Sequence, residues 1–224
     1  MSDLFASVAG QRITYAIVRI PYSGAWVADL DVDTDTVMGG KVEIKIGALS
    51  LIGTIDPRFS GAFAMNTKLR VVAGNGKIDT GLKAKDYAND LEIKMQTVVA
   101  DIVREAGEVL DSTYSDPMRF GAHYVRQSAP ASRLLRQMVG SSWWVDLDGV
   151  VRIGERAQAE IAEDYEVLDF DPRTKIATVS TDNPAAIRIG SVLRGRLSNP
   201  IVVLGINLLV DGDKTRLMCW GDHL

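Results

Sequence analysis

The first 80 residues alternate between hydrophobic and polar positions, a period of two that is typical of half-buried β-strands. Glycine, proline and asparagine interrupt the alternation every few residues, as turns between short strands require. The strands that this pattern predicts are 13–20, 25–35, 42–46, 49–55, 69–73 and 77–80. Short strands joined by tight turns favour a small closed barrel, which leaves no sheet edge exposed. We therefore assign a first β-barrel to residues 1–82.

The hydrophobic period changes in the middle of the chain, where two helices are expected. Thr97 can cap the start of the first, whose hydrophobic residues then fall on one face until Gly107 ends it. The second begins near Pro130, a residue tolerated in a first turn, and ends at Gly140. With the strands around them, these helices predict a helix-containing αβ insert over residues 83–164.

Two adjacent tryptophans, Trp143 and Trp144, open a strand that the turn Asp148-Gly149 joins to a second strand. Neighbouring strand residues point to opposite faces, so one tryptophan can fill the core beneath the second helix. The other then meets solvent, another domain or a partner chain, unless the chain itself covers both faces. Exposed large aromatics are enriched at protein interfaces, which makes Trp143 and Trp144 candidate interface residues.

Strand patterns return over the last 60 residues, again separated by turn residues. The predicted strands are 167–170, 175–180, 186–189, 192–197, 201–209 and 215–220. We assign a second β-barrel to residues 165–224. The expected fold class is therefore mainly β (α+β), with two small β-barrels joined by an insert that carries the Trp-Trp hairpin.

Composition narrows the classes of partner. The chain has 224 residues, a net charge of −4 and no segment dense in lysine and arginine, so sequence-independent binding of nucleic acid is not favoured. The single cysteine, Cys219, excludes an internal disulfide and any cysteine-cluster metal site. The first ten residues lack the pattern of a signal peptide, and no apolar stretch approaches 18 residues, so membrane insertion is not expected.

Four aspartates, Asp29, Asp31, Asp33 and Asp35, occupy alternate positions of one predicted strand. A calcium loop of the EF-hand type needs glycine at its sixth position and glutamate at its twelfth, and neither Asp29 nor Asp31 starts such a loop. We interpret the four as an acidic strand face that looks at water, because like charges on one face are repulsive and costly to bury.

No arrangement typical of catalysis is present. The chain lacks the GxSxG, HExxH, GxxxxGK[ST] and GxGxxG patterns. Gly74-Asn75-Gly76-Lys77 comes nearest to a phosphate loop, but no predicted helix follows it, so a hairpin turn is the simpler interpretation. Glu105 and Glu108 could form a carboxylate pair, yet they lie on a helix rim that we expect to be solvated. We expect neither an enzyme nor a cofactor or metal site.

Several segments of the second half resemble bacteriophage tail hub proteins of contractile-tail baseplates. In that family a short helix leads into a tryptophan-bearing strand, an Asp-Gly turn and a second strand that ends in glycine. The segments that carry the resemblance are 124–130, Leu134-Leu135, 143–154, 189–193, 202–209 and 215–220. Over residues 1–110 the resemblance is limited to the order of strands and helix.

The resemblance implies a structural role. Hub proteins of this kind carry two tube-like barrels, so a homotrimer presents six barrels around a channel and joins a sixfold tail tube to a threefold spike. The implied partners are the tail tube protein, the spike protein and other baseplate proteins, with DNA passing through unbound. The implied location is the virion tail baseplate, assembled in the host cytoplasm. A channel that passes DNA should not hold it, so we expect the acidic face Asp29–Asp35 to line the channel or its mouth.

Three other roles are compatible with the same sequence. A tube-terminating ring protein of the same particle would form rings of six rather than three copies. A tail-associated cell-wall hydrolase would need acidic residues that converge in space. A carbohydrate-binding β module would use exposed aromatics such as Trp143 or Trp144 to stack on sugars.

Overall fold

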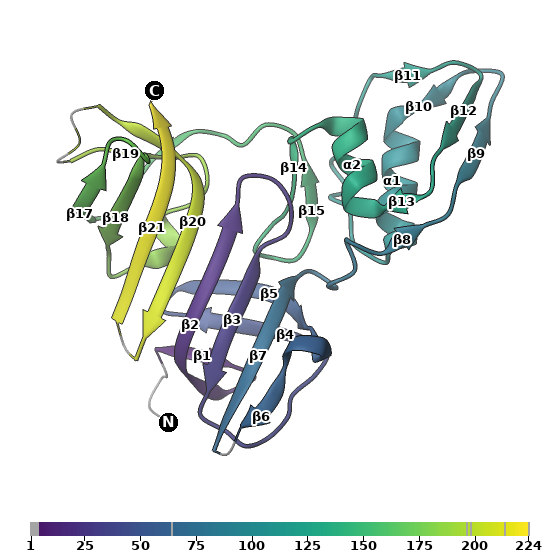
Figure 1. The fold of residues 1–224 in the computed structure, drawn as a ribbon. Coiled ribbons are helices and arrows are strands. Elements are labelled where there is room, and N and C mark those ends of the chain that lie inside the picture. Colours follow the sequence, from purple (N-terminus) through teal and green to yellow (C-terminus); the bar gives the residue numbers. More distant parts are fainter. Residues whose placement is uncertain (1–4, 64, 196, 198, 213, 224) are drawn as a thin grey trace.

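The computed structural model describes residues 5–63, 65–195, 197, 199–212 and 214–223. It is mainly β, as expected, with two short α-helices in the described residues (Figure 1). The first unit contains β1 (Ala6–Val8), β2 (Gln11–Pro21), β3 (Val27–Val32), β4 (Lys41–Ile46), β5 (Leu49–Ile55), β6 (Gly61–Phe63) and β7 (Asn66–Ala73). The predicted strand 49–55 coincides with β5.

The first unit is a closed barrel. Its strands follow the order β1-β4-β5-β7-β3-β2, and β1 also pairs with β2, which closes the ring. The closing strand is only three residues long, with Ala6 opposite Ile46 and Ser7 opposite Arg12. The predicted barrel is therefore confirmed. Its closing strand was not predicted, because three residues are too few to show an alternation of apolar and polar positions.

The predicted hairpin strand 77–80 is wrong, because this segment folds around a carboxylate instead of pairing with β7. The backbone N–H groups of Asn75 and Lys77 donate to the two carboxylate oxygens of Glu108, at 2.9 and 2.6 Å. Glu108 is buried, so these bonds replace the water that its charge would otherwise require. The same contact shows that Glu108 does not belong to a solvated helix face.

The insert contains β8 (Gly81–Leu82), β9 (Lys85–Ala88), β10 (Ile93–Lys94), α1 (Met95–Ala106), β11 (Arg119–Phe120), β12 (His123–Arg126), β13 (Ala129–Pro130), α2 (Ala131–Val139), β14 (Trp143–Val145) and β15 (Val151–Ile153). Its helices and the small sheets β8–β13, β9–β12 and β10–β11 project to one side of the barrels (Figure 1). The first helix begins two residues before Thr97, and Lys94 stands at its N-cap. Gly107, in the left-handed region at φ 84°, ends it as predicted.

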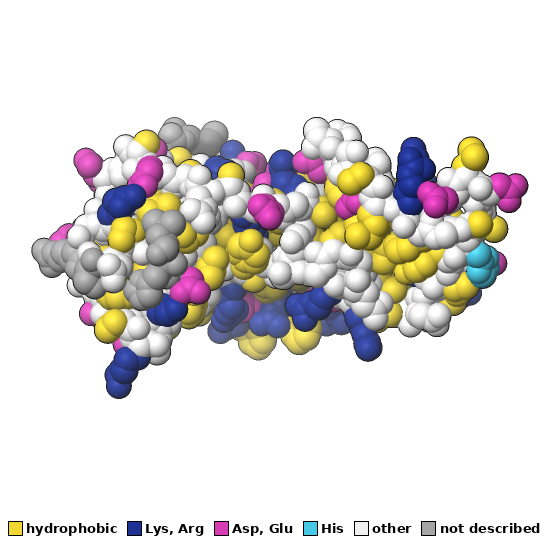
Figure 2. Space-filling model, turned by 90° about the horizontal axis from the view of Figure 1, so that it is seen from above, with side chains coloured by type: hydrophobic (Ala, Val, Ile, Leu, Met, Phe, Trp, Pro, Cys, Tyr) yellow, Lys and Arg dark blue, Asp and Glu magenta, His cyan; other side chains and the backbone are white. Residues whose placement is uncertain are grey.

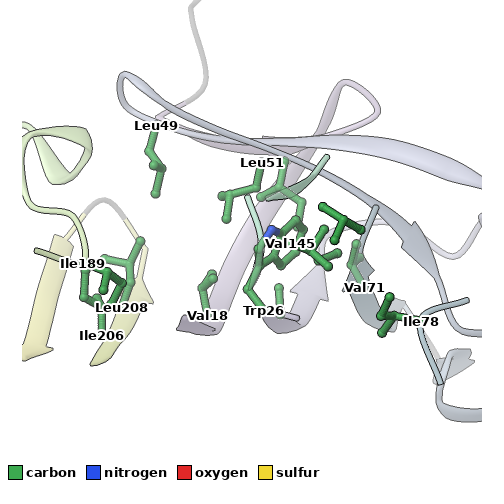
Figure 3. Packing of buried hydrophobic residues seen from close by; sticks show 14 of the residues in the cluster. Val18, Trp26, Leu49, Leu51, Val71, Ile78, Val145, Ile189, Ile206 and Leu208 are labelled. Carbon is green, nitrogen blue, oxygen red and sulfur yellow. The ribbon is translucent and has the colours of Figure 1, made fainter. Parts of the chain in front are cut away.

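The Trp-Trp hairpin, β14 and β15, packs against the first barrel and is hydrogen-bonded to it. Gly24 and Val145 each donate a backbone hydrogen bond across this contact, to Trp143 and to Gly24 respectively, both at 3.0 Å. The indole N–H of the buried Trp26 donates to the carbonyl of Asp146 at 3.2 Å. Figure 3 shows Trp26 beside Val145, so the hairpin extends the barrel core rather than the projecting part of the insert.

The second unit contains β16 (Ala159–Glu160), β17 (Glu166–Asp171), β18 (Ile176–Ser180), β19 (Ser191–Leu193), β20 (Ile201–Asp211) and β21 (Lys214–His223). The predicted strand 186–189 is wrong: Asn183 caps a 3-10 turn over Pro184–Ala186, which the proline initiates. The predicted strand 192–197 is shorter, because β19 ends at Leu193 and residue 196 lies outside the described residues.

In the second unit a side-chain hydrogen bond, rather than a strand ladder, connects the region after β19 to the region before β17. Among the described strands no ladder joins β16 or β19 to β17. Instead the backbone N–H of Arg194 donates to the hydroxyl of Tyr165 at 2.7 Å, just after β19 and just before β17. Ladder pairing therefore closes the first unit, whereas a tyrosine bridges the ends of the second.

One sheet runs through both units, because β2 pairs with β3 on one edge and with β20 on the other. The β2–β20 ladder contains seven antiparallel pairs, from Tyr15 opposite Asp211 to Pro21 opposite Gly205. On its inner side the buried Val18 faces the buried Leu208. The predicted domain limits remain predictions, but the two β units are joined by backbone hydrogen bonds rather than by a linker alone.

We predict that Gly53→Ala destabilises the first barrel. A Cβ at Gly53 would lie 2.6 Å from the carbonyl oxygen of Val72 and 2.7 Å from the Trp26 ring, closer than real Cβ atoms approach. Crowding of this kind costs about 1–3 kcal/mol in the free energy of unfolding, measured by urea denaturation. The control is Gly61→Ala, where the nearest atom is 3.9 Å from the added Cβ. Equal stabilities of the two variants would contradict the packing described around Trp26.

Candidate functional site

The outer face of the shared sheet is the surface on which the predicted acidic strand lies. It runs across six strands in the order β7-β3-β2-β20-β21-β18, and its rows are set by the strand register. In one row Arg70, Asp29, Ile17, Leu209 and Arg216 are consecutive neighbours. The predicted acidic residues Asp29 and Asp31 therefore lie within this surface, which we call the sheet face.

The four aspartates do not share one strand. Asp29 and Asp31 are half-buried residues of β3, but β3 ends at Val32. Asp33 and Asp35 are exposed in the following loop, where the backbone N–H of Asp33 donates to Arg12. The predicted strand 25–35 is therefore too long at both ends. Two of the four aspartates belong to β3 and the other two belong to the loop after it.

Basic residues from strands distant in sequence neutralise the two strand aspartates. Arg70 from β7 contacts both carboxylate oxygens of Asp29, at 2.7 and 3.1 Å, and Arg19 from β2 contacts one of them at 2.7 Å. Lys68 lies 3.7 Å from Asp31. The charged side chains of the sheet face are Asp29, Asp31, Asp211, Arg19, Lys68, Arg70, Lys214 and Arg216. The expectation of a purely acidic face is corrected to a face of mixed charge.

This pairing changes the proton affinity of Asp29. Burial alone would raise its pKa, but the hydrogen bonds from Arg70 and Arg19 outweigh burial and hold the pKa below its ordinary value. The three residues come from three neighbouring strands, so an ionised Asp29 ties β7, β3 and β2 together. No periodic signal in the sequence could have identified the partners, because Arg70 is 41 residues away.

The two tryptophans separate as their alternation predicts. Trp143 is buried, with 3% of its surface exposed, and packs in the core. Trp144 is half-buried on the opposite side, where the guanidinium of Arg156 lies 4.2 Å from its ring centroid. Trp143 therefore fills the core, and Trp144 is the tryptophan with a partly open face.

A second charged cluster holds the insert together. Arg126, 1% exposed, donates to Glu105 at 2.6 Å and to the carbonyl of Lys83 at 2.9 Å. Lys85 bridges Glu105 and the buried Asp101, at 2.8 and 2.6 Å. Burial would raise the pKa of Glu105, but Lys85 and Arg126 outweigh it and lower the pKa. Glu105 is thus a structural ion-pair partner and does not converge with Glu108.

The described residues offer neither a reactive cysteine nor a cluster of metal ligands. Cys219 is buried, and burial raises the pKa of its thiol to about 12, which keeps it protonated. No group of three or more His, Cys, Asp and Glu residues is arranged around a common point in the part of the chain that the structure describes. None of the described helices has the length and apolar character that a membrane span requires.

Comparison with known proteins gives matches at the level of structure. No protein-family model and no curated protein matches the chain. A type VI secretion component of E. coli, described as structurally similar to the T4 bacteriophage tail proteins gp27 and gp5, has a TM-score of 0.65 at 11% identity, covering 98% of this chain and 79% of its own. The chain has the fold of phage tail proteins.

Two further tail proteins share this fold over nearly their whole length. A prophage tail protein from Shewanella oneidensis has a TM-score of 0.65 at 10% identity, over 97% of this chain and 95% of its own. The tail protein from Neisseria meningitidis has a TM-score of 0.63 at 12% identity, over 97% and 96%. The resemblance to tail proteins drawn from the sequence is confirmed for the fold, including the first half, where sequence motifs were weakest.

We predict that Asp29 makes stability depend on pH in the acid range. Its folded pKa lies below the unfolded value of about 4, so its stabilisation is complete above that pH and is lost as the pH falls through the folded pKa. Asp29→Asn should lower the free energy of unfolding at pH 7 and flatten its decline below about pH 4. Asp33→Asn, at an exposed loop position, is the control and should follow the parent. The interpretation fails if both variants keep the parent profile in urea titrations between pH 2 and 7.

Proposed function

We propose that this chain is a non-enzymatic structural component of a phage-type tail, acting as the trimeric hub of a contractile-tail baseplate. The observation that carries the proposal is the pair of β units held in one continuous sheet by the β2–β20 ladder. Solved structures that share this fold include tail proteins and a type VI secretion component. A chain that contributes two rigidly linked β units can supply six such units from three copies.

Sixfold and threefold symmetry can then meet in one ring. Three chains related by a threefold axis place their β units at six positions around the axis, which matches a sixfold tail tube on one side and a threefold spike on the other. Closed rings of identical chains require the same interface at each contact, and rigid linkage of the two units keeps those contacts equivalent. In this proposal the partners are the tail tube protein, the spike protein and other baseplate proteins.

The sheet face is proposed to line the central channel. Three of its basic residues are paired with aspartates, Arg19 and Arg70 with Asp29 and Lys68 with Asp31, and apolar side chains such as Ile17 lie between them. A wall with paired charges offers few free cations to phosphate groups, so DNA can pass without being retained. The pairing of Asp29 and Asp31 with basic side chains, rather than a net negative charge, would serve this purpose.

The projecting part of the insert is proposed to contact neighbouring chains. Hydrophobic side chains gather over this end of the molecule in Figure 2. Leu91, Met118 and Val125 of this part are 80%, 55% and 43% exposed, and the rings of Phe120 and Tyr124 stack there with their centroids 4.2 Å apart. Exposed apolar surface of this kind marks interaction sites in proteins that assemble. The proposed location is the virion tail, with assembly in the host cytoplasm.

Mass in solution tests the trimer. We expect a particle of three times the 24.4 kDa chain mass by native mass spectrometry, and a threefold ring in electron micrographs with the sheet face toward the hole. Leu91→Asp should shift the protein toward monomer, because it places a charge in the proposed contact. Val37→Asp, at an exposed apolar residue of the first barrel, is the matched control and should leave the mass unchanged.

Other masses would redirect or reject the proposal. A ring of six copies would favour a tube-terminating ring protein. A monomer at all concentrations, or a trimer with the sheet face buried against protein, would reject the hub.

A further inference from the structure

A cavity of about 320 Å³ lies where the first barrel, the Trp-Trp hairpin and the second unit meet. Its lining residues come from all three parts of the chain. The apolar ones that matter here are Ile20, Leu49, Trp144, Ile189, Ile206 and Leu208. Figure 3 shows Leu49 on the side of the first barrel and Ile189, Ile206 and Leu208 on the side of the second unit.

The cavity sits on the inner side of the β2–β20 ladder. Ile20 of β2 pairs with Ile206 of β20, and both line it together with Leu208. The two cores therefore touch along the ladder but leave a hollow beneath it. Its volume falls in the range of pockets that hold small organic molecules, and its walls are mainly apolar, as in such pockets.

Arg156 is the exception in this apolar wall. Its Nε donates to the carbonyl of Tyr22 at 2.9 Å, and one terminal nitrogen lies 3.4 Å from the carbonyl of Pro21. These contacts use two of the five N–H groups of a guanidinium. Its plane also rests against Trp144, so packing on one side and carbonyls on another fix its position.

No described carboxylate lies within ion-pair distance of Arg156. Asp146, which also lines the cavity, is bound to Arg152 at 2.7 Å. Glu155 stands exposed at the rim. Burial lowers the pKa of Arg156 to about 10, which still leaves the guanidinium charged at neutral pH. Arg156 is thus a half-buried, charged group with donors to spare beside an apolar hollow, and charges withdrawn from water in proteins are usually paired with an opposite charge.

We infer that this cavity binds an organic carboxylate with an apolar chain, with Arg156 holding the carboxylate and the inter-unit hollow holding the chain. A charge-assisted pair with a guanidinium fixes the head group, and burial of methylene groups supplies the rest of the affinity. The same chemistry is offered by a free medium-chain acid and by the C-terminal residue of a peptide. The site is independent of the number of copies in a ring and goes beyond the proposed tail role.

Calorimetric titration of the full chain with octanoate tests the site. We expect saturable binding of one octanoate per chain. Octan-1-ol and octyltrimethylammonium should bind at least about tenfold more weakly, because neither accepts the guanidinium bonds as an anion does. Acetyl-Leu-Leu with a free carboxylate, compared with its amide, separates the two sources: binding of the free acid form extends the site to peptide C-termini, and binding of octanoate alone restricts it to small acids.

Three variants assign the binding to this cavity. Arg156→Gln should weaken octanoate binding at least about tenfold. Ala157→Trp, at an exposed residue of the cavity wall, should block entry and leaves Arg156 intact. Arg173→Gln, at an exposed arginine of the second unit outside the cavity, should bind octanoate like the parent. The inference is overturned if octanoate shows no saturable binding, or if Arg156→Gln and Ala157→Trp both bind it as the parent does.

Discussion

The β2–β20 ladder is the constraint on which the rest of this molecule depends. Its seven residue pairs convert two separate β units into one sheet, and backbone hydrogen bonds fix the distance and twist between the units. The sheet face and the cavity beneath it both span this junction, so the ladder determines their geometry. The rows of the sheet face exist only because β3, β2, β20 and β21 are in continuous register. The cavity beneath the ladder exists because the two cores approach each other there without merging.

Individual side-chain contacts then attach the hairpin and the insert to the first barrel. The Trp-Trp hairpin covers the end of the first barrel, and Trp26 joins the two through its indole hydrogen bond. Glu108 is held by the backbone of the loop that follows β7, which attaches the end of α1 to the barrel. Arg126 does the same within the insert by pairing with Glu105. Polar contacts of the buried Glu108 and Arg126 therefore fix the insert in place together with its apolar core, although Nε and Nη1 of Arg126 make no hydrogen bond among the described residues.

The sequence predicted strands such as β2, β4, β5 and β20, because their residues are β-branched or alternate between apolar and polar positions over most of each strand. It could not predict β1, which is three residues long, or the ladder that joins β2 to β20, because pairing partners leave no mark on either strand alone. The predicted acidic face is correct for two of its four aspartates. Asp29 and Asp31 do lie on one outer face, but Arg19 and Arg70 reach them from other strands, and only the register reveals that charge balance. Likewise, Arg156 carried no signal in the sequence, since its role follows from what surrounds it.

Through the β2–β20 ladder the two β units should move as one body. Hydrogen exchange measured residue by residue can detect whether they do. The backbone amides of β20 should exchange as slowly as those of β3 in the closed barrel, and both sets should exchange more slowly than the amides of the edge strand β17. Fast exchange of the β20 amides that face β2, with the β3 amides still protected, would show that the junction opens by itself and that the two units are not one body.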